Sequence, residues 1–213
     1  GQLYRTTFGI QIDRKNSLKG QLEVHGLSVS HVQSITLTHL HPDHTAGLID
    51  FPHADIYMAK EEHKYVTELT ADNFYSQHFD EKHWQHSSRI HFLEFSNQSW
   101  NGFRSVALPH IADNACLVEL PGHTGGAHSG VAIRVGEKWI FHVGDAYFLK
   151  DDLHEKLSDR HLTSEIVQAA ISPNTPLRHQ TVQKIRQLKA KLKDKLILIS
   201  SHEEFDSDQI FSE

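Results

Sequence analysis

The stretch that decides the fold of this chain is Thr38-His39-Leu40-His41-Pro42-Asp43-His44. Three imidazoles and a carboxylate fall within six residues, directly after the apolar alternation of Ile35-Thr36-Leu37. Side chains two apart on a strand share a face, so His39 and His41 can point the same way. Imidazole and carboxylate are standard ligands of zinc and related metals. We therefore predict a metal site at a strand end. The alternative is a His-rich surface turn, in a chain with 19 histidines.

The composition is that of a single globular domain. The chain has 213 residues, of which 38% are hydrophobic and 23% charged, enough for one buried core. A net charge of −6 without a basic stripe argues against a nucleic-acid partner. The one cysteine, Cys116, excludes an intrachain disulfide and reads as a core residue in a reducing compartment. No membrane span or signal peptide is visible, so we expect a soluble, cytoplasmic protein without a membrane partner.

Extended and helical patterns alternate along the chain and indicate one α/β domain over residues 1–213. An extended opening is predicted over 1–12, and strands over 34–38, 55–59, 103–108, 115–120, 130–135, 138–143 and 196–199. Helices are predicted over 18–27, 60–69, within 151–170, and over 176–192. The aromatic-rich segment 71–100 is only weakly periodic, which fits either a lid over a pocket or a local satellite core.

Potential ligands stand at the ends of four separate strands. Besides the His39-to-His44 turn, they are His123 within Pro121-Gly122-His123-Thr124, Asp145 after Gly144, and His202 after the last apolar run. His123 and Asp145, each taken alone, are most simply turn residues. As an ordered set they resemble the metallo-β-lactamase superfamily of metal-dependent hydrolases, whose H-x-H-x-D-H signature matches the first turn.

This resemblance implies a four-layer αββα sandwich with a dinuclear metal centre on one edge. His39, His41 and His123 would hold the first ion, Asp43, His44 and His202 the second, and Asp145 would bridge them. Zinc is the expected metal, although manganese, iron or cobalt suit the same ligands. A hydroxide shared by the ions would attack the carbonyl of a small ester, and Asp43 would relay a proton to the leaving group.

Within the superfamily, the first turn resembles lactonases and glyoxalase II-like thioesterases. Gly144-Asp145-Ala146-Tyr147 is similar to the quorum-quenching N-acyl homoserine lactonases, in which a Tyr three residues after the bridging Asp contacts the substrate carbonyl. Here Tyr147 follows Asp145 by two residues, which leaves it either a catalytic residue or a packed aromatic. A lactone is the leading substrate. A thioester is the second candidate, and a non-catalytic, His-rich metal-binding protein is the alternative from another class.

The start of the chain departs from the family pattern. That fold opens with a strand pair and a D-T-G-like turn, whereas only about 38 residues precede His39 here and no such turn is present. We expect the first strands to be missing or replaced. A shortened sheet exposes an edge, which favours a homodimer.

Overall fold

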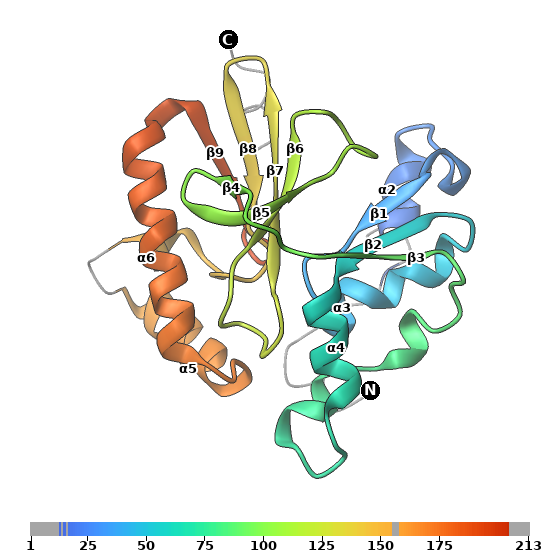
Figure 1. Ribbon diagram of the computed structural model, residues 1–213, viewed down its shortest axis with the longest axis horizontal. Coiled ribbons are helices and arrows are strands. Elements are labelled where there is room, and N and C mark those ends of the chain that lie inside the picture. The colour runs from blue at the N-terminus through green and yellow to red at the C-terminus, as the bar shows by residue number, and fades with distance from the viewer. Residues whose placement is uncertain (1–12, 14, 16, 155–157, 205–213) are drawn as a thin grey trace.

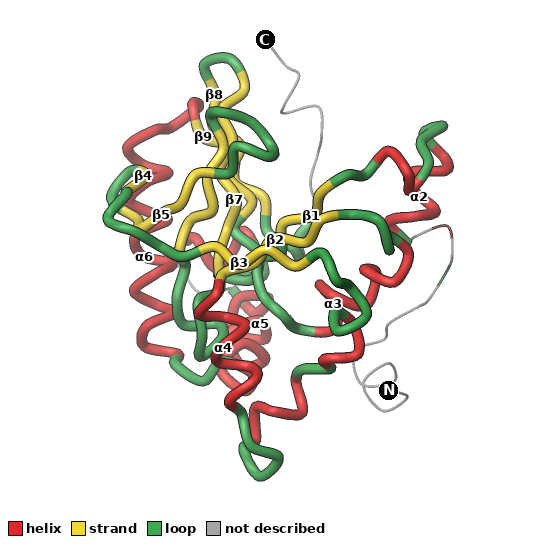
Figure 2. Tube along the Cα trace, turned by 45° about the vertical axis from the view of Figure 1, so that its right-hand side comes forward, coloured by secondary structure: helices red, strands yellow, loops and turns green. Residues whose placement is uncertain are grey.

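The computed structural model describes residues 13, 15, 17–154 and 158–204. The chain forms two β-sheets that pack against each other, with helices on their outer faces (Figures 1 and 2). The predicted extended opening over 1–12 lies outside the described residues, and the question of missing first strands lies there too. Among the described helices, none combines the length and apolar character needed to cross a bilayer.

The first sheet is small and wholly parallel, in the order β1-β2-β3. Its strands are β1 (Ser34–Thr36), β2 (Asp55–Ala59) and β3 (Ile90–Leu93). Parallel neighbours need crossover connections, and helices supply them. The helical segments of this half are α2 (Leu18–Val24), η2 (Val29–His31), α3 (Pro42–Thr45), η3 (Ala46–Asp50), α4 (Lys60–Glu68), η4 (Phe74–His78) and η5 (Glu81–His83).

The second sheet has six strands in sequence order from β4 to β9. They are β4 (Ser99–Trp100), β5 (Phe103–Ala107), β6 (Ala115–Glu119), β7 (Ser129–Val135), β8 (Lys138–His142) and β9 (Leu196–Ile199). All pairs are antiparallel except β8 with β9. The crossover to β9 runs through η6 (Lys150–Leu153), α5 (Asp159–Ile171), α6 (Thr175–Leu192) and η7 (Lys193–Lys195).

Three buried clusters fill the three gaps between four layers. Successive residues of a strand face opposite sides of its sheet, and on β6 Val118 packs in one cluster with Ile185 of α6 while Leu117 packs in another with Ala59 of β2. The third cluster joins Ile56 of β2 to the helices of its half. The order helix, sheet, sheet, helix confirms the predicted αββα sandwich.

The predicted elements agree with the observed ones to within a few residues, apart from β3 and β4, which were not predicted. Both lie within the aromatic-rich segment 71–100. In that segment Trp84 is buried in the cluster around β2, and Phe79 packs against it. Part of the segment is therefore the predicted satellite core. Cys116 is also a core residue, packed against the cluster of α6, and burial raises the pKa of its thiol to about 11.

Candidate functional site

The His-rich turn joins β1 to α3. Two of its candidate ligands precede the helix and two lie within it. His39 and His41 lie in the extended chain after β1, whereas Asp43 and His44 lie in the first turn of α3. Pro42 takes the first helical position, where its missing N–H has no intrahelical partner to lose. The helix therefore begins between the two pairs of candidate ligands, and the His44 ring stays close to that of His39, with ring centroids 4.0 Å apart.

The other three candidate ligands follow strands of the second sheet. His123 lies after β6, Asp145 after β8 and His202 after β9. Gly122 shapes the first of these turns, because its φ is +120° and a Cβ there would lie 2.2 Å from the backbone nitrogen of Arg178. The structure thus brings all seven predicted ligands to one edge of the sandwich, from both sheets.

Three imidazoles of the first group face one another. Nδ1 of His41 lies 3.1 Å from Nε2 of His39 and 3.1 Å from Nε2 of His123, and all three side chains are buried. Asp145 Oδ2 lies 3.5 Å from His123 Nε2 and 3.8 Å from His39 Nε2. One ligand atom from each of these four residues lies within 4.8 Å of the others.

The second group shares Asp145 with the first. Asp145 Oδ2 lies 2.9 Å from His202 Nε2, and Oδ1 lies 3.3 Å from His44 Nε2. Asp43 Oδ2 completes the group at 3.5 Å from His44 and 3.7 Å from His202. The four ligand atoms again lie within 4.8 Å of one another. Because Asp145 belongs to both groups, its carboxylate can bridge two ions.

The donor set fits divalent ions. An ion held tetrahedrally by bonds of about 2.0–2.1 Å separates its ligand atoms by roughly 3.3 Å, close to the imidazole spacings here. Burial lowers the pKa of His41 to about 4 and that of His39 and His123 well below 6.5, so these rings are neutral, as metal binding requires. Within the described chain, Oδ1 of Asp145 is buried without a well-aligned hydrogen bond, so a lone pair is left for a cation.

The second group differs in charge, because it contains the two carboxylates of Asp43 and Asp145. Burial disfavours the protonated His44, but the facing carboxylates of Asp145 and Asp43 outweigh it and raise its pKa to about 10. Burial alone would raise the pKa of Asp145, yet its hydrogen bond to His202 and the surrounding imidazoles hold it well below its usual range. The two carboxylates therefore hold a proton where they could hold a metal ion.

Tyr147 does not join this site. Its side chain is 1% exposed, packs in the core cluster of α6 and does not line the cavity beside the ligands, which favours the packed aromatic of the two readings. The neighbouring Phe148, three residues after Asp145, faces the site instead: its ring centroid lies 4.2 Å from that of His202 and 6.1 Å from that of His123.

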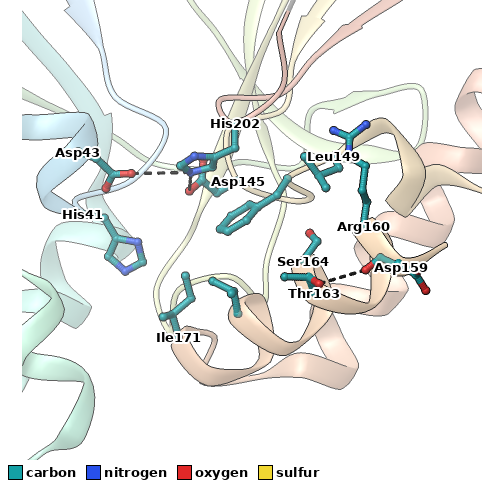
Figure 3. A pocket seen from close by; sticks show the side chains of 12 residues that line it. His41, Asp43, Asp145, Leu149, Asp159, Arg160, Thr163, Ser164, Ile171 and His202 are labelled. Atoms are coloured by element: carbon teal, nitrogen blue, oxygen red, sulfur yellow. Dashed lines mark hydrogen bonds and ion pairs between the residues drawn. The ribbon is translucent and has the colours of Figure 1, made fainter. Parts of the chain in front are cut away.

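A cavity of about 610 Å³ opens beside the ligands (Figure 3). Asp145 and His202 lie on one side of it and the α5 side chains, including Thr163 and Ile171, on the other. Phe148 also lines it. The full lining is His41, Asp43, Asp145, Phe148, Leu149, Asp159, Arg160, Thr163, Ser164, Val167, Ile171 and His202. Its size and mixed lining suit a small organic molecule.

Two buried residues that support the site were not predicted. His128 donates from Nδ1 to the carbonyl of Leu120 at 2.9 Å and accepts the backbone N–H of Asp145 on Nε2 at 3.0 Å. Glu62 of α4 accepts hydrogen bonds from Leu40 and Thr124, each next to a ligand. No sequence signal separates His128 from the many other histidines, or Glu62 from Glu61.

Comparison with known proteins agrees with this geometry. The family described as "Anti-Pycsar protein Apyc1" matches residues 3–212. The "Probable metallo-hydrolase Mb2322c" of Mycobacterium bovis is 32% identical over 135 residues, which are 62% of this chain and 43% of that protein. The chain thus spans less than half the length of this curated relative.

Solved structures share the fold. A probable metal-dependent hydrolase from Staphylococcus aureus has a TM-score of 0.66 at 17% identity, covering 95% of this chain and 65% of its own. AidC, a dizinc quorum-quenching lactonase, has a TM-score of 0.65 at 20% identity, and the match covers 90% of this chain and 64% of AidC. These likenesses confirm the metallo-β-lactamase fold that the H-x-H-x-D-H signature suggested.

Proposed function

The chain belongs to the family of the anti-Pycsar protein Apyc1, and from this premise we propose that it is a hydrolase that uses two divalent metal ions to cleave a small ester. A lactone is the leading substrate. The observation that carries the proposal is the pair of ligand groups that share Asp145 and open onto one cavity. AidC, a dizinc lactonase by name, supports both the metal and the substrate class.

In this proposal, His39, His41 and His123 hold one ion, Asp43, His44 and His202 hold the other, and Asp145 bridges them. Zinc is the first candidate, because neutral imidazoles and carboxylates are its usual ligands. When bound, two such ions would supply Lewis acidity and a water molecule that ionises near neutral pH. The seven side chains fix where that chemistry takes place, at the mouth of the cavity.

The remaining steps fall to the chain's own residues. Asp43 is partly exposed on the cavity side of the site, beside His44 and His202, where a carboxylate can take up a proton and return it to a leaving group. Phe148 and Ile171 offer apolar wall on which an acyl group can lie. This arrangement orients a carbonyl toward the ligands while the rest of the substrate extends along α5.

The test combines metal content with a substrate panel of acyl lactones, a glutathione thioester and bis(4-nitrophenyl) phosphate. The phosphodiester belongs in the panel because two-metal centres also support in-line displacement at phosphorus. We expect about two tightly bound ions and lactone opening that chelation abolishes and zinc restores. Thioester or phosphodiester cleavage alone would reassign the substrate class.

Asp145→Ala separates an enzyme from a metal-binding protein without turnover. The bridging carboxylate serves both groups, so its loss should release at least one ion and lower turnover more than about 100-fold. The matched control is Asp113→Ala, an exposed turn residue that belongs to neither ligand group and does not line the cavity. Many weakly held ions, indifferent to Asp145→Ala, would refute the proposal.

A further inference from the structure

We propose that Glu62 is a positioning residue that fixes the ligands of the first ion by joining the two loops that carry them. This inference rests on the proposed function, because it concerns how the first ion is held. Glu62 is 1% exposed and belongs to neither ligand group. Among the described residues it forms no ion pair with a cation, and a buried carboxylate of this kind needs another reason for its position.

The two carboxylate oxygens of Glu62 accept hydrogen bonds from residues that are sequence neighbours of three candidate ligands. The N–H of Leu40, which lies between His39 and His41, donates to Oε1 at 3.3 Å. The hydroxyl of Thr124, next to His123, donates to Oε2 at 2.6 Å. One carboxylate therefore spans the turn after β1 and the loop after β6, which belong to different sheets and are joined here through a side chain of α4.

The close approach of α4 to the second loop depends on two glycines. A Cβ at Gly126 would lie 2.7 Å from Cα of Glu62, and one at Gly125 would lie 2.3 Å from the ring of Tyr65. Only hydrogen at these positions lets the first turn of α4 lie directly on the loop. The Gly125-Gly126 pair, which directly follows Thr124, therefore admits the carboxylate between the loops.

The hydrogen bonds call for a carboxylate and not an amide. Leu40 and Thr124 both donate, one to each oxygen, and the N–H of Ala127 adds to them. Position in the first turn of a helix also favours a negative charge. A glutamine would present its NH2 to one of these donors. Burial opposes the charge and raises the pKa of Glu62 to about 7, while the hydrogen bonds from Thr124, Leu40 and Ala127 act in the opposite direction and favour the carboxylate.

The experiment compares Glu62→Gln with Glu61→Gln, the exposed neighbour on the same helical turn. Zinc affinity of each site is measured by competition with a chromophoric chelator, and the ligand field by visible absorption of the cobalt-substituted protein. We expect Glu62→Gln to weaken the first site by about 10- to 100-fold and to change its cobalt spectrum, with the second site affected less. Glu61→Gln should match the wild type.

Thr124→Val and Thr124→Ser provide the same test from the other side of the hydrogen bond, should Glu62→Gln fail to fold. The valine variant should weaken the first site and the serine variant should retain it. Equal loss at both sites, or no loss at either, in a wild-type protein that binds two ions would overturn this inference alone. A wild-type protein that binds no ion tightly would overturn the proposed function, and this inference with it.

Discussion

Asp152 joins the loop after β8 to helix α5, and its replacement tests the structure sharply. The side chain is 2% exposed. It accepts hydrogen bonds on Oδ2 from Phe148 N (3.0 Å), Leu149 N (3.1 Å), Ser164 Oγ (3.0 Å) and Gln168 Nε2 (3.0 Å), and on Oδ1 from His161 Nδ1 (2.9 Å). One carboxylate thus holds the cavity wall of Phe148 against α5.

The arrangement of these donors sets the size of the effect. Asp152→Ala leaves five donors without their acceptor, and removing one member of such a buried charged network costs about 3–5 kcal/mol of unfolding free energy. Asp152→Asn can place its carbonyl oxygen where Oδ2 lies and keep four donors. Its amide then faces the His161 ring, whose other tautomer can accept, so the cost falls to about 1 kcal/mol.

Urea unfolding followed by circular dichroism measures both variants at equal metal content, because bound ions shift the apparent stability. Asp113→Ala, an exposed turn residue, is the control and should stay within about 0.5 kcal/mol of the wild type. Two results would refute the reasoning. One is a loss below about 1.5 kcal/mol in Asp152→Ala; the other is an equal loss in the asparagine and alanine variants.

Three further predictions concern the site and its support. Phe148→Ala should raise KM about tenfold because a cavity wall is lost, whereas Tyr147→Phe should leave kcat and KM within about threefold; steady-state kinetics with the reverse outcome would show that the tyrosine acts on the substrate. Gly126→Ala should lower the unfolding free energy by about 1–3 kcal/mol, since its Cβ would meet the backbone of Glu62, while Gly47→Ala, with no described atom within 4 Å, should not. In metal-free protein, the pKa of Glu62 is raised from 4.5 to about 7, so the folded state binds the proton more tightly. The contribution of Glu62 to the free energy of unfolding is therefore greatest below pH 4.5, and it falls by about 3 kcal/mol as the pH rises from 4.5 through 7. Glu62→Gln should lack this part of the pH dependence in urea titrations, and parallel curves for the two proteins would contradict it.

The grouping of the candidate ligands could be predicted because their signal is local and ordered. His39, His41, Asp43 and His44 lie within one turn, and His123 and Asp145 each follow a recognisable apolar strand. Strand periodicity places such residues at sheet ends without any knowledge of long-range contacts. The four layers were expected from the resemblance of this ordered set to the metallo-β-lactamase superfamily, and the two buried faces of β6 agree with them.

The supporting residues could not be predicted because their roles depend on contacts distant in sequence. Glu62 reads as one of two exposed acids on an amphipathic helix, and it is buried only because Gly125-Gly126, some 60 residues later, let the loop approach. Tyr147 and Phe148 are adjacent aromatics, and only the path of the chain after β8 decides which of them faces the cavity. Strand β3 was not predicted because it lies in the aromatic-rich segment 71–100, where the hydrophobic pattern is only weakly periodic.

Each ion group draws two ligands from the turn after β1 and two from the ends of the six-stranded sheet. A bound ion would therefore act as a removable cross-link between the two halves of the sandwich. At a free ion concentration one hundred times the dissociation constant, each bound ion would add about 2.7 kcal/mol to the stability of the folded state. Chelation of the ions would therefore weaken the contact between the two sheets, and the distance between the two halves of the sandwich would report whether metal is bound.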